Sequence, residues 1–161
     1  DEFQGVYETV AAAATAALVV RLALPERLDA RAGIGVGQLE VVGASAYGLT
    51  QDGPAWWSAR EAVVSIKDDE RRLPGLRTTV VHADGPGEQE AWMNGYLASR
   101  DAVVTRLDGR QRRLALGVLR GTTRAALADR EGISASAVSQ SLRRSGAVEV
   151  LHGVSLLGYG R

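Results

Sequence analysis

Residues 122–146 of this chain read TTRAALADREGISASAVSQSLRRSG and contain two short helical patterns separated by a glycine. Gly132 can adopt the positive φ that a tight turn between helices needs, and the apolar Ile133 follows it. Ser134 is placed to cap the second helix, in which Val138 and Leu142 form a buried stripe four residues apart. The pattern predicts a helix-turn-helix. The alternative is an ordinary helical hairpin with solvated arginines.

The second helix of this pattern has an outward face of small and hydrogen-bonding side chains. Such a helix can enter the major groove of double-stranded DNA without steric clash. One unit of this kind usually binds as a dimer on two half-sites, so we expect a homodimer. The residues expected to contact DNA are Thr123, Arg124, Ser134, Ala135, Ser136, Ser139, Gln140, Arg143 and Arg144.

The chain has no net charge, but its charges are unevenly distributed. Residues 110–144 contain eight arginines against Asp129 and Glu131, a balance of +6. Residues 1–109 contain ten basic and sixteen acidic side chains, a balance of −6. A basic segment that coincides with a helix-turn-helix pattern favours contact with DNA phosphates. The alternative is that the two halves of the chain attract each other.

The composition excludes several kinds of site. Without cysteine there is no disulfide, no thiolate nucleophile and no cysteine-ligated zinc. Neither His82 nor His152 lies in a metal-ligand spacing, and the sequence has no G-x-S-x-G elbow and no Walker loop. No apolar run reaches membrane-spanning length and no signal peptide is recognisable, which favours a cytoplasmic protein without a membrane partner.

Residues 1–83 have the pattern of a small α+β domain. Residues 3–7 suit a strand, and Thr9 can cap an alanine-rich helix over residues 10–24. Alternating glycines in a strand over residues 30–42 indicate the close approach of a helix, a ligand or another backbone, and packing against the alanine-rich helix is the commoner explanation. A loop over residues 43–53, a helix over 54–67, a solvated turn over 67–72 and a strand over 76–82 complete this part.

The Gly-Pro-Gly stretch within residues 83–87 predicts a domain boundary. Helices over residues 88–107 and 110–119 precede the helix-turn-helix, and the tail over 147–158 fits either a two-stranded wing or one more helix. We therefore expect an α+β domain over residues 1–83, a connecting helix over 84–109 and an all-α helix-turn-helix domain over 110–161.

Three stretches together resemble the bacterial SatD family: DEFQG (residues 1–5), RAGIGVGQLEVVG (31–43) and SAYGLTQDGPAWWSAREAV (45–63), followed by the helix-turn-helix. The resemblance spans nearly the whole chain. Members usually begin earlier, with a first strand and helix ahead of a GDEFQG motif. Because the chain opens directly on Asp1, we expect it to be an N-terminally truncated fragment.

The first half more distantly resembles the palm-like catalytic domain of class III nucleotidyl cyclases and GGDEF proteins. This resemblance implies an incomplete ferredoxin-like sheet with helices. It matches Asp1 to a metal ligand, and Arg31 and Arg60 to nucleotide-binding positions. Trp56 replaces the asparagine of those families, and the first metal-binding strand is absent. The chain is thus expected to be catalytically inactive and to bind no cofactor, with Mg²⁺ conceivable only in a full-length parent.

Two hypotheses follow. The first is a DNA-binding transcriptional regulator of the SatD type, in which a cyclase-like sensor or scaffold domain precedes the helix-turn-helix. The alternative is a nucleotide-binding protein, or a Mg²⁺-dependent nucleotidyl-transfer enzyme in the full-length parent, whose helical tail serves for docking.

Overall fold

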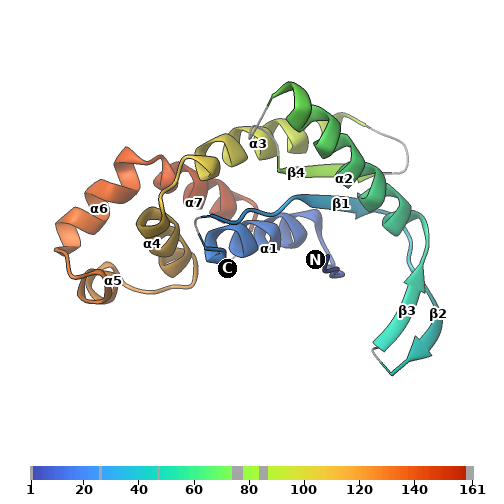
Figure 1. Cartoon of the computed structure of the whole chain (residues 1–161), viewed down its shortest axis with the longest axis horizontal. Coiled ribbons are helices and arrows are strands. Elements are labelled where there is room, and N and C mark those ends of the chain that lie inside the picture. The colour runs from blue at the N-terminus through green and yellow to red at the C-terminus, as the bar shows by residue number, and fades with distance from the viewer. Residues whose placement is uncertain (1, 26, 47, 74–77, 84–86, 159–161) are drawn as a thin grey trace. The chain divides into compact units, whose positions relative to one another are not determined.

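The computed structural model describes residues 2–25, 27–46, 48–73, 78–83 and 87–158 (Figure 1). Seven helices and four strands in two small sheets occupy this described part, which confirms the predicted α+β class. The chain forms two compact units. Residues 31–101 form one, here called the sheet unit, and residues 1–30 with 102–161 form the other, here called the helical unit.

The sheet unit is built on two parallel strands. β1 (Ala32–Val36) pairs with β4 (Thr79–Ala83), in a register that runs from Ala32 opposite Thr79 to Val36 opposite Ala83. Parallel strands need a long crossover connection, and α2 (Pro54–Arg72) supplies it. Ala62 and Ile66 of α2 share a buried cluster with Val80.

Alternating glycines let α2 lie directly against β1. A Cβ atom on Gly33 would lie 2.3 Å from the carbonyl oxygen of Ala59, and one on Gly35 would lie 1.9 Å from that of Ala55. Both positions exclude any side chain. The glycines therefore serve helix packing as predicted, but the helix is α2 and not the alanine-rich helix, so that part of the prediction is wrong.

Side chains of α3 (Glu88–Thr105) hydrogen-bond to the edge of β4 that does not pair with β1. The Asn94 amide accepts a hydrogen bond from the Val81 N–H at 2.8 Å and donates one to the Val81 carbonyl at 2.9 Å. Glu90 accepts from the Ala83 N–H at 2.8 Å. These contacts satisfy backbone groups that would otherwise be open to strand pairing.

Three predicted segments of the N-terminal half differ in the structure. Residues 3–7 form no strand and are exposed, because a short segment without a neighbouring strand leaves its backbone groups unpaired. Residues 43–53, predicted as a loop, lie largely in a hairpin of β2 (Glu40–Ser45) and β3 (Gly48–Asp52). Residues 67–72, predicted as a turn, continue α2, where Asp68 and Arg71 form an ion pair one turn apart.

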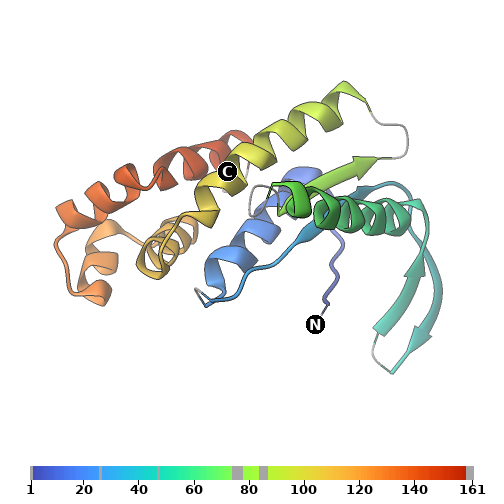
Figure 2. The same cartoon turned by 45° about the horizontal axis from the view of Figure 1, so that its top comes forward.

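The helical unit combines α1 (Val10–Ala23) with four C-terminal helices (Figure 2). As predicted, Thr9 caps α1 by accepting from the Ala12 N–H at 3.1 Å. Leu18 and Leu22 of α1 are buried in one core with Leu114, Leu127, Val138, Leu142, Val150 and Val154. The helices are α4 (Gly109–Leu119), α5 (Arg124–Glu131), α6 (Ala135–Arg144) and α7 (Ala147–Leu156).

The sequence predicted domain boundaries after residues 83 and 109. The compact units of the structure are divided elsewhere, after residues 30 and 101. Residues 1–30 group with the C-terminal helices because the apolar side of α1 packs there. The Gly-Pro-Gly stretch predicted as a boundary lies mostly outside the described residues.

A buried arginine fixes the C-terminal end of α1. Arg21, whose side chain is 1% exposed, donates from Nε and Nη2 to the two carboxylate oxygens of Asp29, both at 2.7 Å. Nη2 also donates to the Thr105 hydroxyl at 3.1 Å. Burial of Asp29 opposes its ionisation, but the hydrogen bonds and the charge of Arg21 outweigh it and lower the pKa of Asp29.

We expect Asp29→Asn to reduce the free energy of unfolding by about 1–3 kcal/mol at pH 7, measured by urea denaturation. Losing one partner of a fully buried pair costs about 3–5 kcal/mol, and the partial exposure of Asp29 reduces this. Because the pKa of Asp29 is lowered by folding, its contribution is present above pH about 4 and lost as the solution is acidified, so the variant has a shallower acid dependence. Asp68→Asn, which breaks an exposed ion pair, is the control and should cost less than about 0.5 kcal/mol.

Candidate nucleic-acid interface

The stretch predicted as a helix-turn-helix forms two helices joined by a short turn, α5 and α6, and is called the helix-turn-helix below. Thr123 caps α5 by accepting from the Ala126 N–H at 3.2 Å, and Ser134 caps α6 by accepting from the Ala137 N–H at 3.1 Å. Gly132 ends α5 in the left-handed conformation, with φ 65°. The Ser134 cap and the Gly132 turn were predicted from sequence and are confirmed, whereas the Thr123 cap was not predicted.

The inner sides of α5 and α6 hold the motif together. Leu127 and Ala128 of α5 are buried with Val138 and Leu142 of α6, and Ile133 packs against them from the turn. Behind them, α4 approaches α5 closely at Gly117, where a Cβ atom would lie 2.4 Å from Leu127 Cδ2. This close approach was not predicted, because a single glycine within a helix gives no sign of what faces it.

The tail is helical, so the two-stranded wing does not form among the described residues. Gly146, with φ 77°, is the N-cap residue before α7, whose Val150 and Val154 join the core. Burial of these side chains four residues apart decides between the two structures that the sequence left open.

The opposite side of α6 is open. Ser136, Ser139, Gln140 and Arg143 are spaced by three and four residues and so form one stripe, here called the outer stripe. Ser136, Gln140 and Arg143 are exposed and Ser139 is half-buried, while Ala135 and Arg144 beside the stripe are exposed. Thr123 and Arg124 at the start of α5 are exposed too.

Glu131 forms ion pairs with two of the arginines that the sequence offered for contact with DNA phosphates. Arg113 donates from Nε and Nη2 to its two carboxylate oxygens, both at 2.7 Å, and Arg110 Nε lies 3.5 Å away. The hydrogen bonds from Arg113, together with the charges of both arginines, lower the pKa of Glu131. A third arginine, Arg112, is buried and donates to the Leu107 carbonyl at 3.2 Å.

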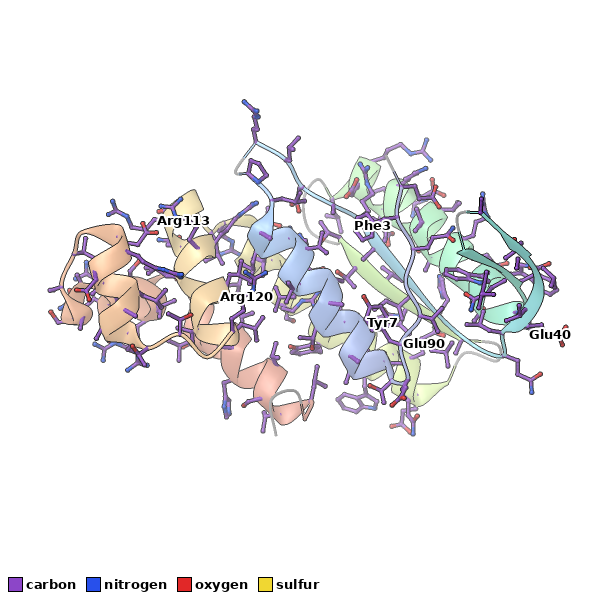
Figure 3. All side chains as sticks on the ribbon, turned by 90° about the horizontal axis from the view of Figure 1, so that it is seen from below. Phe3, Tyr7, Glu40, Glu90, Arg113 and Arg120 are labelled. Carbon is purple, nitrogen blue, oxygen red and sulfur yellow. The ribbon has the colours of Figure 1, made fainter. Side chains whose placement is uncertain are left out.

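The other five arginines of residues 110–144 are exposed and form no ion pair within the described part of the chain. We call them the unpaired arginines: Arg120, Arg124, Arg130, Arg143 and Arg144. Figure 3 shows Arg113 on α4 and Arg120 directly after it. The charge balance counted from sequence therefore overstates the cations that a ligand meets, and the structure restricts them to the end of α4 and to the helix-turn-helix.

Of the residues expected to bind nucleotide or metal, the structure describes Arg31 and Arg60, and these two lie apart. Asp1 lies outside the described residues. Arg31 donates to Glu70 at 2.6 Å, whereas Arg60 lies ten residues earlier on α2, about 15 Å along the helix axis. Across the described ranges, no three His, Cys, Asp or Glu side chains are grouped so that they could hold a metal ion.

The family model of the SatD family matches residues 1–152. The chain belongs to the SatD family. The match extends from the N-terminal segment into α7 and includes the whole helix-turn-helix of this SatD chain. No curated protein and no solved structure matches the chain. Among the described helices, none has both the length and the apolar character needed to cross a membrane.

We expect Glu131→Gln to lower the free energy of unfolding by about 1 kcal/mol at pH 7, because the bidentate contact with Arg113 loses its charge. Folding lowers the pKa of Glu131, so its carboxylate stabilises the wild-type protein above pH about 4.5 and this contribution is lost in acid. The difference in stability between wild-type and variant should therefore be present at pH 7 and shrink as the pH falls. Denaturation curves at pH 7 and pH 3 measure both effects.

Asp129→Asn on the same helix is the matched control, since Asp129 is exposed and forms no ion pair with a described residue. Equal losses of stability in the two variants would show that Glu131 has no special role in holding α4 against α5.

Proposed function

We propose that this SatD-family chain binds double-stranded DNA by placing α6 in the major groove, and that it acts as a transcriptional regulator with the sheet unit as sensor or scaffold. The proposal depends on the second helix of the helix-turn-helix. Its outer stripe faces solvent, and the same helix carries the unpaired Arg143 and Arg144. The proposal implies a cytoplasmic protein and, on two half-sites, a dimer.

The small side chains at the start of α6 support binding in the major groove of DNA. The first residues of α6 are Ala135 and Ser136, so the leading end of the helix is narrow. A major groove about 12 Å wide admits a helix of this kind. A helix that met another protein would be expected to present large apolar or aromatic side chains instead, and the outer stripe contains none.

The distribution of charge supports phosphate contact. Arg143 and Arg144 lie in the last turn of α6, and Arg124 and Arg130 lie at the two ends of α5. Long cationic side chains that flank a groove-binding helix can reach the backbones on either side of it. Because the structure commits none of these four to an ion pair within its described part, binding DNA breaks no internal contact of theirs.

We expect the full chain to bind a random-sequence 30-base-pair duplex at low salt, with an affinity that falls steeply as salt is added. The double variant Arg143→Ala/Arg144→Ala should weaken binding and reduce the magnitude of the slope of log K against log salt by about 2. Each phosphate contact that forms releases about one counterion from the DNA, and the variant forms two contacts fewer. Fluorescence anisotropy over a salt series measures both values.

The double variant Arg71→Ala/Arg72→Ala is matched in charge and removes arginines from the end of α2 in the sheet unit. It should leave the salt slope unchanged. Absence of binding by the wild-type chain at low salt, or equal slopes for all three proteins, would refute the proposal.

A further inference from the structure

We infer that Gln140 is the residue that determines sequence specificity, and that it does so by recognising an adenine in the major groove. This inference rests on the proposed function and assigns the base-reading role within the outer stripe. It follows from which polar groups of α6 are already engaged in the folded chain and which are still available to a ligand.

The two serines of the outer stripe, and the capping Ser134, have hydrogen bonds inside the motif. Ser139 Oγ donates to the Ala135 carbonyl at 3.1 Å. The hydroxyls of Ser134 and Ser136 lie 2.9 Å apart and hydrogen-bond to each other, while Ser134 also accepts from the Ala137 N–H. Short side chains with committed hydroxyls give the helix room to approach a base pair, but they offer little to distinguish one base from another.

Gln140 differs from these three serines in the length of its side chain and in having an uncommitted polar group. It is exposed and is the sixth of the ten residues of α6, about 6 Å along the axis from Ser136 on the same stripe. Its side-chain amide has no hydrogen-bond partner among the residues that the structure describes. One acceptor and two donors therefore remain free at the end of a long side chain.

The chemistry of a free primary amide selects adenine. In the major groove adenine presents N7 as an acceptor beside N6 as a donor, which a glutamine amide can pair with simultaneously. Guanine presents two acceptors, N7 and O6, so the amide oxygen would face a second oxygen without a proton between them. A good bidentate contact discriminates by about 1–3 kcal/mol, which corresponds to about 5- to 150-fold in affinity.

Arg143, the other long side chain of the stripe, lies at a different end of the helix and is assigned a different role. It lies in the last turn of α6, next to Arg144. Recognition helices contact bases mainly through residues nearer their N-terminus, whereas cations at the far end approach the phosphate backbone. We therefore assign Arg143 to positioning, with an effect on affinity that is the same for every sequence.

The test is selection of binding sites from a pool of random duplexes by three full-length proteins: wild-type, Gln140→Ala and Gln89→Ala. Gln89 is an exposed glutamine of α3 outside the helix-turn-helix and provides the matched control. We expect wild-type and Gln89→Ala to select the same site with at least one required A·T pair. Gln140→Ala should lose the preference at that pair alone and bind the best site about 5- to 150-fold more weakly.

The contact itself is tested by changing atoms of the base. Replacing the required adenine with 7-deazaadenine removes N7, and replacing it with purine removes the N6 amino group. Either change should weaken binding by wild-type and have little further effect on Gln140→Ala. Because Gln140 is exposed, all three proteins should unfold at the same temperature, which confirms that the differences arise from the contact.

The outcomes separate the inference from the proposed function. If no protein enriches or binds any duplex, the proposed function fails and the inference with it. If a site is selected but Gln140→Ala keeps every preference, or if the base analogues weaken wild-type and variant equally, DNA binding stands and the role of Gln140 is refuted.

Discussion

Burial of one side of α6 is the constraint that orients the outer stripe. Ten residues are too few for a helix to be stable alone in water. α6 is held by Val138 and Leu142, which are 0% and 1% exposed in the core of the helical unit. With these two positions facing inward, the helical period forces Ser136, Gln140 and Arg143 to the opposite side. The composition of the outer stripe is thus inseparable from the packing that orients it.

That packing is not local to the motif. The core that receives Val138 and Leu142 also contains Leu18 and Leu22 from α1, more than a hundred residues earlier in the chain. Arg21 then ties the end of α1 to Asp29 and to Thr105, just before α4. The helix-turn-helix therefore belongs to a compact unit built from both ends of the chain, and its rigidity depends on contacts far from the residues that define the motif.

The sequence predicted correctly what depends on neighbouring residues. Thr9 and Ser134 cap their helices, and Gly132 makes the turn, because capping and left-handed backbone geometry are decided within a few residues. The orientation of α6 followed from its apolar spacing. The unexpected features depend on tertiary partners. The glycines of β1 indicated a close approach but could not tell that α2, and not α1, makes it. The segment at residues 3–7 has strand-forming side chains but no strand. Counting charges could not show that Arg110 and Arg113 are already paired with Glu131.

The pairing with Glu131 reduces the charge repulsion within a basic segment that also carries unpaired arginines. Eight arginines held without counter-charges in one small unit would repel each other and weaken its compact state. Glu131 offsets part of this repulsion on the side of α5 that faces α4, where Arg113 is bound through two hydrogen bonds. The unpaired arginines remain toward solvent, where water and salt screen their mutual repulsion at little cost in stability. The same separation suits a protein that binds a polyanion, because the cations that hold the fold together are not those that a phosphate backbone would meet.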